Sequence, residues 1–265
     1  MNPKALVMIQ PQPLPGSYLN NGETLEEVLN KVLREAQMIH NIGFDGFILQ
    51  NMHDGPVAQK VKPETIAYMT IIGKSIKREF PNNILGVLIN WDGVAGLVVA
   101  DAIGADFVRV EHLYTGVSVA ASGFMEGQCI EILETKKRLG SKVKIYADVQ
   151  EVNSNYLCPE PKPLAAKTVV KSAYADGIFI SGSSTEESLS IVNETRKLLP
   201  ETPIFLGGGA TGENIYELLM EYDGVAVATW IKNGDMRNPI DKKRAIQFLN
   251  ESRRAGKDRK SEVRI

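Results

Sequence analysis

The residues most suggestive of chemistry lie in the stretch FLGGGATGEN, at positions 205 to 214. Its glycines at 207, 209 and 212 follow the G-x-G-x-x-G spacing, which is typical of a turn that brings backbone amides close to a phosphate. A dinucleotide-binding turn also needs an acidic residue about 20 positions later, to hold the ribose hydroxyls. The next apolar run ends in VATWIK, without an acid. The stretch therefore favours phosphate or another anion, with a bare structural turn and a dinucleotide site as the alternatives.

Other loops are expected to complete this anion site. The expected phosphate-binding residues combine glycine amides with hydroxyl and ammonium donors: Gly182, Ser183, Gly208, Gly209, Gly212, Thr229 and Lys232. The stretch SGSSTEE, which contributes the first two, also fits a helix start with Ser184 or Thr185 as the cap and Glu187 in the first turn. Both roles can coexist.

A second group of residues offers acid/base chemistry. Asp148 ends an apolar run, where a carboxylate is costly to desolvate unless it has a partner or a task, so it is the strongest candidate. Arg109 and Glu111 share one face of a strand at i and i+2, which predicts an inward ion pair that orients substrate or shifts Asp148, or a purely structural pair. Asn51 and His53 follow another strand and complete the expected catalytic set.

No cofactor is predicted, and metal binding is left open. Carboxylates that converge at one rim could hold a hard divalent cation, but no H-x-x-x-H or D-x-D spacing supports it. Asp92 fits a helix cap equally well. Cys129 and Cys158 lie far apart, so a zinc site or a disulfide framework is not expected.

The elements that must position these residues alternate regularly along the chain. Eight short apolar runs predict strands at 5–10, 46–51, 84–90, 107–112, 142–149, 177–182, 204–208 and 224–230. Eight amphipathic segments predict helices at 24–43, 63–80, 93–105, 125–140, 163–175, 185–199, 212–222 and 241–254. Alternation implies parallel strands, and eight units in 265 residues favour a single closed TIM-type (β/α)₈ barrel over a doubly wound open sheet. A short charged tail from about 253 is expected to be a solvated helix end.

The barrel separates structural from functional polar residues. Catalytic groups lie at the carboxyl ends of the strands, and the loops after the last two strands commonly bind phosphate. The glycine stretch follows the seventh strand and meets this expectation. Turns before four strands contain an aspartate at the opposite rim, so Asp45, Asp106, Asp176 and Asp223 are expected to be turn formers.

Composition limits the partners. A net charge of −2, from 30 basic and 32 acidic residues, gives no reason to expect nucleic acid. No run approaches the roughly 20 apolar residues of a membrane span, and no leader is recognised, so we expect a cytoplasmic protein. The loop PLPGSYLNNG, at 13–22, is expected to be a lid or a subunit contact, which leaves a homo-oligomer open.

The residues at the predicted strand ends resemble those of the BtpA family, also called the BtpA/SgcQ family. The matching stretches cover nearly the whole chain: PLPGS, GFDGFILQN with DGP, GADFVRVEHLYTG, GFMEG, ADV, ADGIFISGSST, PIFLGGGATGENI and DGVAVATWIKNGDMRNPIDKKRAIQFL. The last two are the most specific. The resemblance implies a barrel of the ribulose-phosphate-binding type; one family member is associated with photosystem I biogenesis, and others look like enzymes of sugar or nucleoside metabolism.

The chain is a divergent member by the same comparison. The family tends to have His where Gln10 stands, Asn where Leu88 stands, T-D-Q-G where this chain has AASG at 120–123, and basic residues where QEVN follows Asp148. The leading hypothesis is an enzyme, a lyase, isomerase or hydrolase, acting on a small phosphorylated ligand such as a sugar or nucleoside phosphate. The alternative is a non-catalytic scaffold or assembly factor of the photosystem I biogenesis type.

Overall fold

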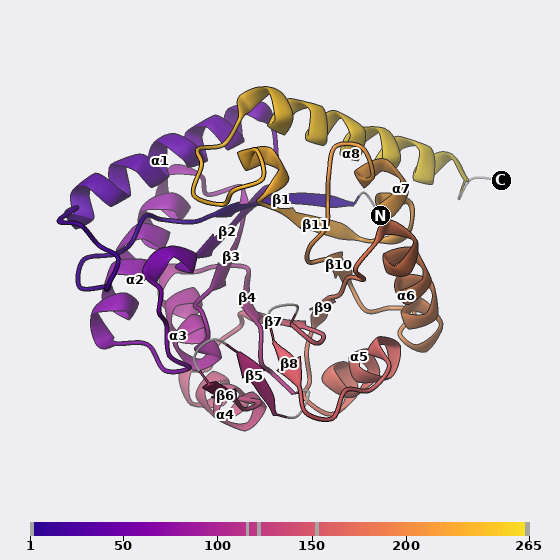
Figure 1. The fold of residues 1–265 in the computed structure, drawn as a ribbon, viewed down its shortest axis with the longest axis horizontal. Coiled ribbons are helices and arrows are strands. Elements are labelled where there is room, and N and C mark those ends of the chain that lie inside the picture. The colour runs from indigo at the N-terminus through magenta and orange to yellow at the C-terminus, as the bar shows by residue number, and fades with distance from the viewer. Residues whose placement is uncertain (1–2, 115–116, 121–122, 152–153, 263–265) are drawn as a thin grey trace.

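The chain folds into a closed barrel of eight parallel strands surrounded by helices (Figure 1). The computed structural model describes residues 3–114, 117–120, 123–151 and 154–262. The barrel strands are β1 (Lys4–Ile9), β2 (Gly46–Gln50), β3 (Ile84–Leu88), β4 (Phe107–Val110), β7 (Lys144–Asp148), β9 (Gly177–Phe179), β10 (Ile204–Leu206) and β11 (Gly224–Val227). β1 pairs with β2 and, across the closure, with β11. The expected TIM barrel is confirmed, and each of its strands lies within one residue of a predicted apolar run.

Eight α-helices in the described residues cover the outside of the barrel. They are α1 (Leu25–Ile42), α2 (Pro63–Glu79), α3 (Gly93–Ile103), α4 (Cys129–Leu139), α5 (Lys162–Lys171), α6 (Thr185–Leu198), α7 (Ile215–Glu221) and α8 (Lys242–Glu262). α1 shows why the sequence specifies them: Thr24 and Glu27 form a capping box at its start, and Gly43 ends it in the left-handed conformation. Between these ends, Val28, Val32 and other apolar residues at helical spacing are buried against the barrel.

Two loops at the carboxyl ends of the strands build a small antiparallel sheet that the sequence did not predict. β5 (Ser118–Ala120) and β6 (Gly123–Met125) follow β4, and β8 (Asn155–Tyr156) follows β7. β5 pairs with both of the others. Of the departure at AASG, Ala121 and Ser122 lie outside the described residues.

The inside of the barrel is packed by aromatic rings that face glycines. Phe107, Tyr146 and Phe205 each lie beside a glycine of the paired strand, where a Cβ atom would meet the ring at less than 3 Å. The rings contact one another, with centroids 5.0 Å apart for Phe107 and Tyr146 and 5.6 Å apart for Tyr146 and Phe205. This layer closes the barrel below its polar mouth.

The four aspartates before the strands bind backbone amides at the amino-terminal rim. One carboxylate oxygen of each accepts from the amide of a residue in an adjacent strand: Asp45 from Ala5, Asp106 from Leu85, Asp176 from Ile145 and Asp223 from Ile204. Their expected structural role is confirmed by these four bonds, because all of them lie at the rim away from the polar strand ends.

The charged segment from 253 continues α8 instead of ending it. Arg253 forms an ion pair with Asp45, and Arg259 donates to the Tyr222 carbonyl oxygen and pairs with Asp223. Ala255 between them is fully buried. These contacts fasten the last helix to the amino-terminal rim.

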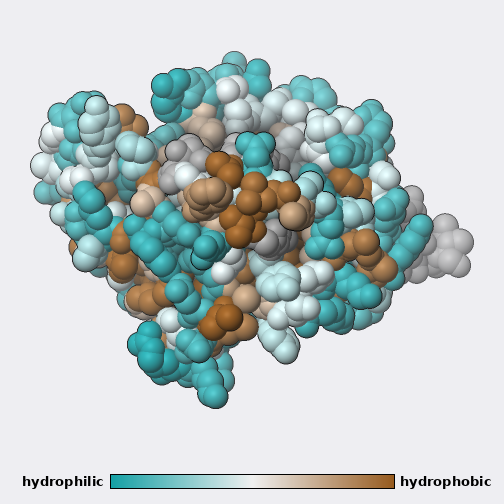
Figure 2. Space-filling view, turned by 60° about the horizontal axis from the view of Figure 1, so that its bottom comes forward, coloured by the Kyte–Doolittle hydropathy of each residue, from teal (hydrophilic) through white to brown (hydrophobic). Residues whose placement is uncertain are grey.

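The face drawn in Figure 2 is mainly hydrophilic, with a group of hydrophobic side chains near its centre and smaller groups elsewhere on it. Exposed apolar residues near the small sheet include Val117, Phe124 and Leu157. Among the helices described here, none is long and apolar enough to cross a membrane. The role of the loop at 13–22 as a lid or a subunit contact stays a prediction.

Asp223 offers a test of the rim. Replacing it with Ala should lower the free energy of unfolding by about 2 kcal/mol, because the buried Ile204 amide loses its acceptor. Urea unfolding followed by circular dichroism measures the change. Asp235→Ala is the control, since its ion pair with Arg237 is solvent-exposed and should contribute less than about 1 kcal/mol. Equal losses in both variants would contradict the structural role.

Candidate active site

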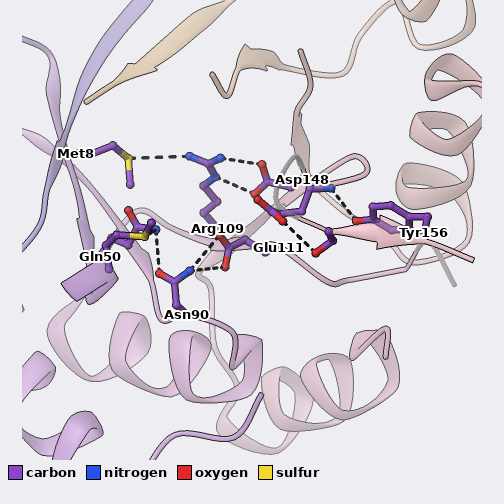
Figure 3. Close-up of polar contacts among 10 residues, drawn as sticks. Met8, Gln50, Asn90, Arg109, Glu111, Asp148 and Tyr156 are labelled. Carbon is purple, nitrogen blue, oxygen red and sulfur yellow. Dashed lines mark hydrogen bonds and ion pairs between the residues drawn. The ribbon is translucent and has the colours of Figure 1, made fainter. Parts of the chain in front are cut away.

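A buried ion pair between Arg109 of β4 and Asp148 of β7 lies at the centre of the barrel mouth (Figure 3). Nε and one terminal nitrogen of Arg109 donate to the two carboxylate oxygens, at 2.8 and 2.7 Å. The guanidinium carbon lies 4.2 Å above the ring of Phe179. Burial acts to lower the pKa of Arg109, but Asp148 and Glu111 raise it by more. Both oxygens of Asp148 are therefore committed to a permanent cation.

Glu111 is a buried carboxyl at the barrel mouth, and it has no ion pair with any described residue. It follows β4, is 7% exposed, and accepts hydrogen bonds from the side-chain nitrogen of Asn90 at 2.9 and 3.2 Å. Burial raises the pKa of Glu111 well above its usual range, Asp148 and Glu151 raise it further, and Arg109 and Asn90 offset only part of this. Arg109 pairs with Asp148, so the expected Arg109–Glu111 pair is replaced by a pair between neighbouring strands.

A chain of amide side chains connects Glu111 to Lys232 along the ends of four strands. The Lys232 ammonium donates to Oε1 of Gln10 at 3.2 Å. Nε2 of Gln10 donates to Oε1 of Gln50, and Nε2 of Gln50 donates to Oδ1 of Asn90, both at 2.8 Å. Every donor points the same way, from the buried ammonium toward the buried carboxyl. Each amide is thereby held in one orientation.

The glycine loop after β10 faces the same cavity of about 820 Å³ that these strand ends line. Gly208, Gly209 and Ala210 line it, and in the described part of the chain their amides donate to no protein acceptor. Gly207 touches the ion pair, since a Cβ atom there would lie 3.3 Å from a terminal nitrogen of Arg109. Gly209 adopts a φ of +77°, which favours glycine.

The remaining residues that were expected to bind phosphate do not all lie at this cavity. Thr229 lines the cavity. Gly212 packs under Trp230, whose ring would meet a Cβ atom at 2.4 Å. Lys232 is 2% exposed and lines a neighbouring cavity instead, where it also donates to the Met236 carbonyl oxygen.

The loop after β9 is occupied by its own helix. The amide of Gly182 donates to the Ser188 hydroxyl, and the amide of Ser183 donates to the Glu187 carboxylate. Ser184 accepts from the Glu187 amide as the N-cap of α6. The capping role is confirmed, and the Gly182 and Ser183 amides are not free for a phosphate in this arrangement.

Asn51 and His53 lie away from the cavity. The Asn51 side chain accepts from the amide of Asn90 and donates to Asp54, so it fixes the β3 end instead of facing the mouth. Asp54 in turn accepts from the amide of Leu14 and anchors the loop after β1. His53 lines the neighbouring cavity with Lys232, and burial together with that lysine lowers its pKa.

The structure describes no metal centre. No group of three or more His, Cys, Asp or Glu residues within metal-binding reach occurs among the described residues. Asp92 caps α3 by accepting from the amide of Ala95, as its alternative interpretation expected.

Sequence reasoning missed three residues of the mouth. Gln50 and Glu151 line the cavity, and Arg244 brings a guanidinium to it while donating to the Trp230 carbonyl oxygen. One signal could have found Gln50: Gln10, Gln50 and Asn90 follow one another at intervals of 40 residues, one β/α unit each. Arg244 carries no such signal, because it reaches the mouth from the start of α8.

Relatives align with most of this chain. The model of the BtpA family matches residues 2–254. Uncharacterized protein MJ1115 of Methanocaldococcus jannaschii is 31% identical over 245 residues, covering 92% of this chain and 92% of that protein. Photosystem I biogenesis protein BtpA of Synechocystis is 33% identical over 245 residues, covering 89% of this chain and 83% of that protein.

A solved structure shares the fold. The 3-hexulose-6-phosphate synthase of Salmonella typhimurium superposes with a TM-score of 0.56 at 16% identity, covering 95% of this chain and 99% of that one. At this identity the likeness concerns the barrel architecture.

Glu111 predicts an unusual dependence of stability on pH. Its folded pKa lies above the unfolded value of about 4.5, so its stabilising contribution is complete below that value and is lost as the pH rises through the folded pKa. Glu111→Gln removes this loss. The variant should match the wild type near pH 4.5 and should have the higher free energy of unfolding at pH 8. Urea unfolding across this range checks it, and a constant difference would contradict it.

Replacing Asp148 is expected to destabilise the protein. Asp148→Asn leaves the Arg109 guanidinium buried without its anion and should lower the free energy of unfolding by about 3 to 5 kcal/mol. The double variant Arg109→Met with Asp148→Leu removes both charges and should recover most of the loss. Thermal and urea unfolding measure both variants. A small loss in Asp148→Asn would show that the pair is solvated.

Proposed function

Because the chain belongs to the BtpA family, we propose that it is an enzyme acting on a small phosphorylated metabolite, a sugar or nucleoside phosphate, at the mouth of its barrel. One observation carries the proposal. A single cavity is lined both by backbone amides that donate to no acceptor among the described residues and by a buried carboxyl whose pKa is raised.

The glycine loop supports the phosphate end of this proposal. Consecutive amides of Gly208, Gly209 and Ala210 offer an anion several donors at no cost in side-chain entropy. Arg244 supplies the cation, because it lines this cavity, whereas Lys232 lines the neighbouring one. The name of the related barrel, a hexulose-phosphate synthase, supports the same class of ligand.

Glu111 supports the reacting end. A carboxyl whose pKa is raised toward neutrality is suited to exchange a proton with substrate, as a general acid or base. Asn90 holds it, and the polarised amide chain keeps the donor side of Asn90 turned toward it. In this proposal Glu111 is the acid/base group instead of Asp148, because both oxygens of Asp148 already bind Arg109.

Arg109 then provides a positive charge that can polarise an oxygen of the substrate. One terminal nitrogen lies 3.9 Å from the sulfur of Met8, a weak acceptor, so this side of the guanidinium is available to a carbonyl or hydroxyl oxygen. An oxygen bound there would be polarised beside Glu111. Proton transfer next to a carbonyl carbon, as in lyases and isomerases, fits this arrangement.

The second candidate is an assembly factor. It is supported by the relative named Photosystem I biogenesis protein BtpA and by the exposed apolar side chains Phe124 and Leu157 beside the mouth. An assembly factor has no need of a buried carboxyl with a raised pKa in a cavity, so the enzyme is favoured.

Gly208 provides the test of the phosphate end. Gly208→Asp places a carboxylate among the amides without a clash, since a Cβ atom there has only the Ser181 hydroxyl, at 3.8 Å, within contact range. Binding of ribose 5-phosphate, followed by calorimetry, should weaken at least about tenfold from charge repulsion. Gly208→Ala is the matched control and should bind like the wild type.

Two outcomes would remove the enzyme proposal. Equal affinity in the wild type and Gly208→Asp would exclude the glycine loop as the phosphate site. No thermal stabilisation of the wild type by any of a panel of sugar and nucleoside phosphates would favour the assembly factor, because a ligand at 100 times its Kd adds roughly 2.7 kcal/mol.

A further inference from the structure

A second cavity of about 720 Å³ lies beside the barrel mouth. It is enclosed by the loop after β1, by α1 and by the loop between β11 and α8. It shares Gln10 and Met236 with the mouth cavity but none of the glycine loop. Its size is in the range of small-molecule sites.

Two cations of this cavity can receive an anion. The Lys232 ammonium is buried, and its two protein acceptors are both uncharged oxygens. Arg34 of α1 is exposed at the wall, and its guanidinium has no hydrogen bond or ion pair to any described residue. By contrast, Lys31 is bound by Gln12, and Arg237 is paired with Asp235.

One acid limits the charge that the cavity accepts. Glu35 lines the same cavity as Lys232, and burial raises its pKa while the lysine offsets part of this. A carboxyl in this position can donate a hydrogen bond to an incoming oxygen when protonated, and it repels a multiply charged group when ionised. The cavity therefore suits a single negative charge better than a phosphate dianion.

The rest of the wall is mainly apolar, although His53 and Asn238 also line it. Side chains from three segments contribute it, including Pro13, Leu19, Val32, Met38 and Ile240. Such a wall binds hydrocarbon and excludes water from the charged end.

We propose that this cavity is a second binding site, which takes a small organic carboxylate with an apolar body. The carboxylate lies between Lys232 and Arg34, and the hydrocarbon lies against Val32 and Ile240. The ligand thus sits at the beginning of the amide chain that leads through Gln10 to Glu111. The site goes beyond the proposed function and does not require it.

The test uses hexanoate and 1-hexanol as probes, with ligand-observed NMR and calorimetry on the full chain. Hexanoate should bind saturably and 1-hexanol at least about tenfold more weakly, because the alcohol cannot form the charge-assisted hydrogen bonds. Arg34→Gln should weaken hexanoate binding by about tenfold. Arg78→Gln, an exposed arginine of α2 outside both cavities, is the matched control and should leave binding unchanged.

Lys232→Met removes the buried ammonium and should abolish hexanoate binding, while Arg34→Gln keeps the test valid if that variant does not fold. Gly208→Asp should bind hexanoate like the wild type, whether or not sugar phosphates bind, which separates this proposal from the proposed function. Absence of saturable hexanoate binding, or equal affinity in Arg34→Gln and Arg78→Gln, would overturn the proposal.

Discussion

The buried ion pair of Arg109 and Asp148 constrains everything around the barrel mouth. Two charges removed from water are tolerated only when their geometry is good and their remaining donors and acceptors are met. Here the pair is bidentate, and the guanidinium is stacked on Phe179. The residue next to the pair must also lack a side chain. Gly207 meets this requirement, because a larger residue would press a Cβ atom against Arg109. The glycine loop thus serves the ion pair as well as any anion.

The same pair leaves Glu111 as a buried carboxyl whose pKa is raised. Asp148 takes the full charge of Arg109, and Glu111 is left in a low-dielectric site with two further acids, Asp148 and Glu151, nearby. The amide chain then adds a directional dipole, which begins at the Lys232 ammonium and ends with the Asn90 donor on Glu111. Neutral amides deliver this polarity without adding a titrating group between the two charges.

The sequence predicted the barrel because the causes are local and repeated. Apolar runs, capping residues such as Thr24 and stop signals such as Gly43 act within a few residues, and the rim aspartates recur at the same place in four units. The partner of Arg109 was not predictable in this way. Spacing along one strand suggested Glu111, but Arg109 faces Tyr146 across the pairing, which brings Asp148 within reach. The direction of the Lys232 side chain was not predictable for a related reason: Lys232 ends a short helical turn, whose direction no strand periodicity determines.

Gln10 and Leu88, which the family resemblance marks as expected departures, have defined contacts in this arrangement. Gln10 both accepts from Lys232 and donates to Gln50, as a neutral imidazole could. Its amide supplies this hydrogen-bond polarity without a titrating group. Leu88 is 2% exposed, lines the cavity and packs in the apolar cluster inside the barrel. Neither side chain therefore adds a titrating group beside Glu111 at the cavity wall.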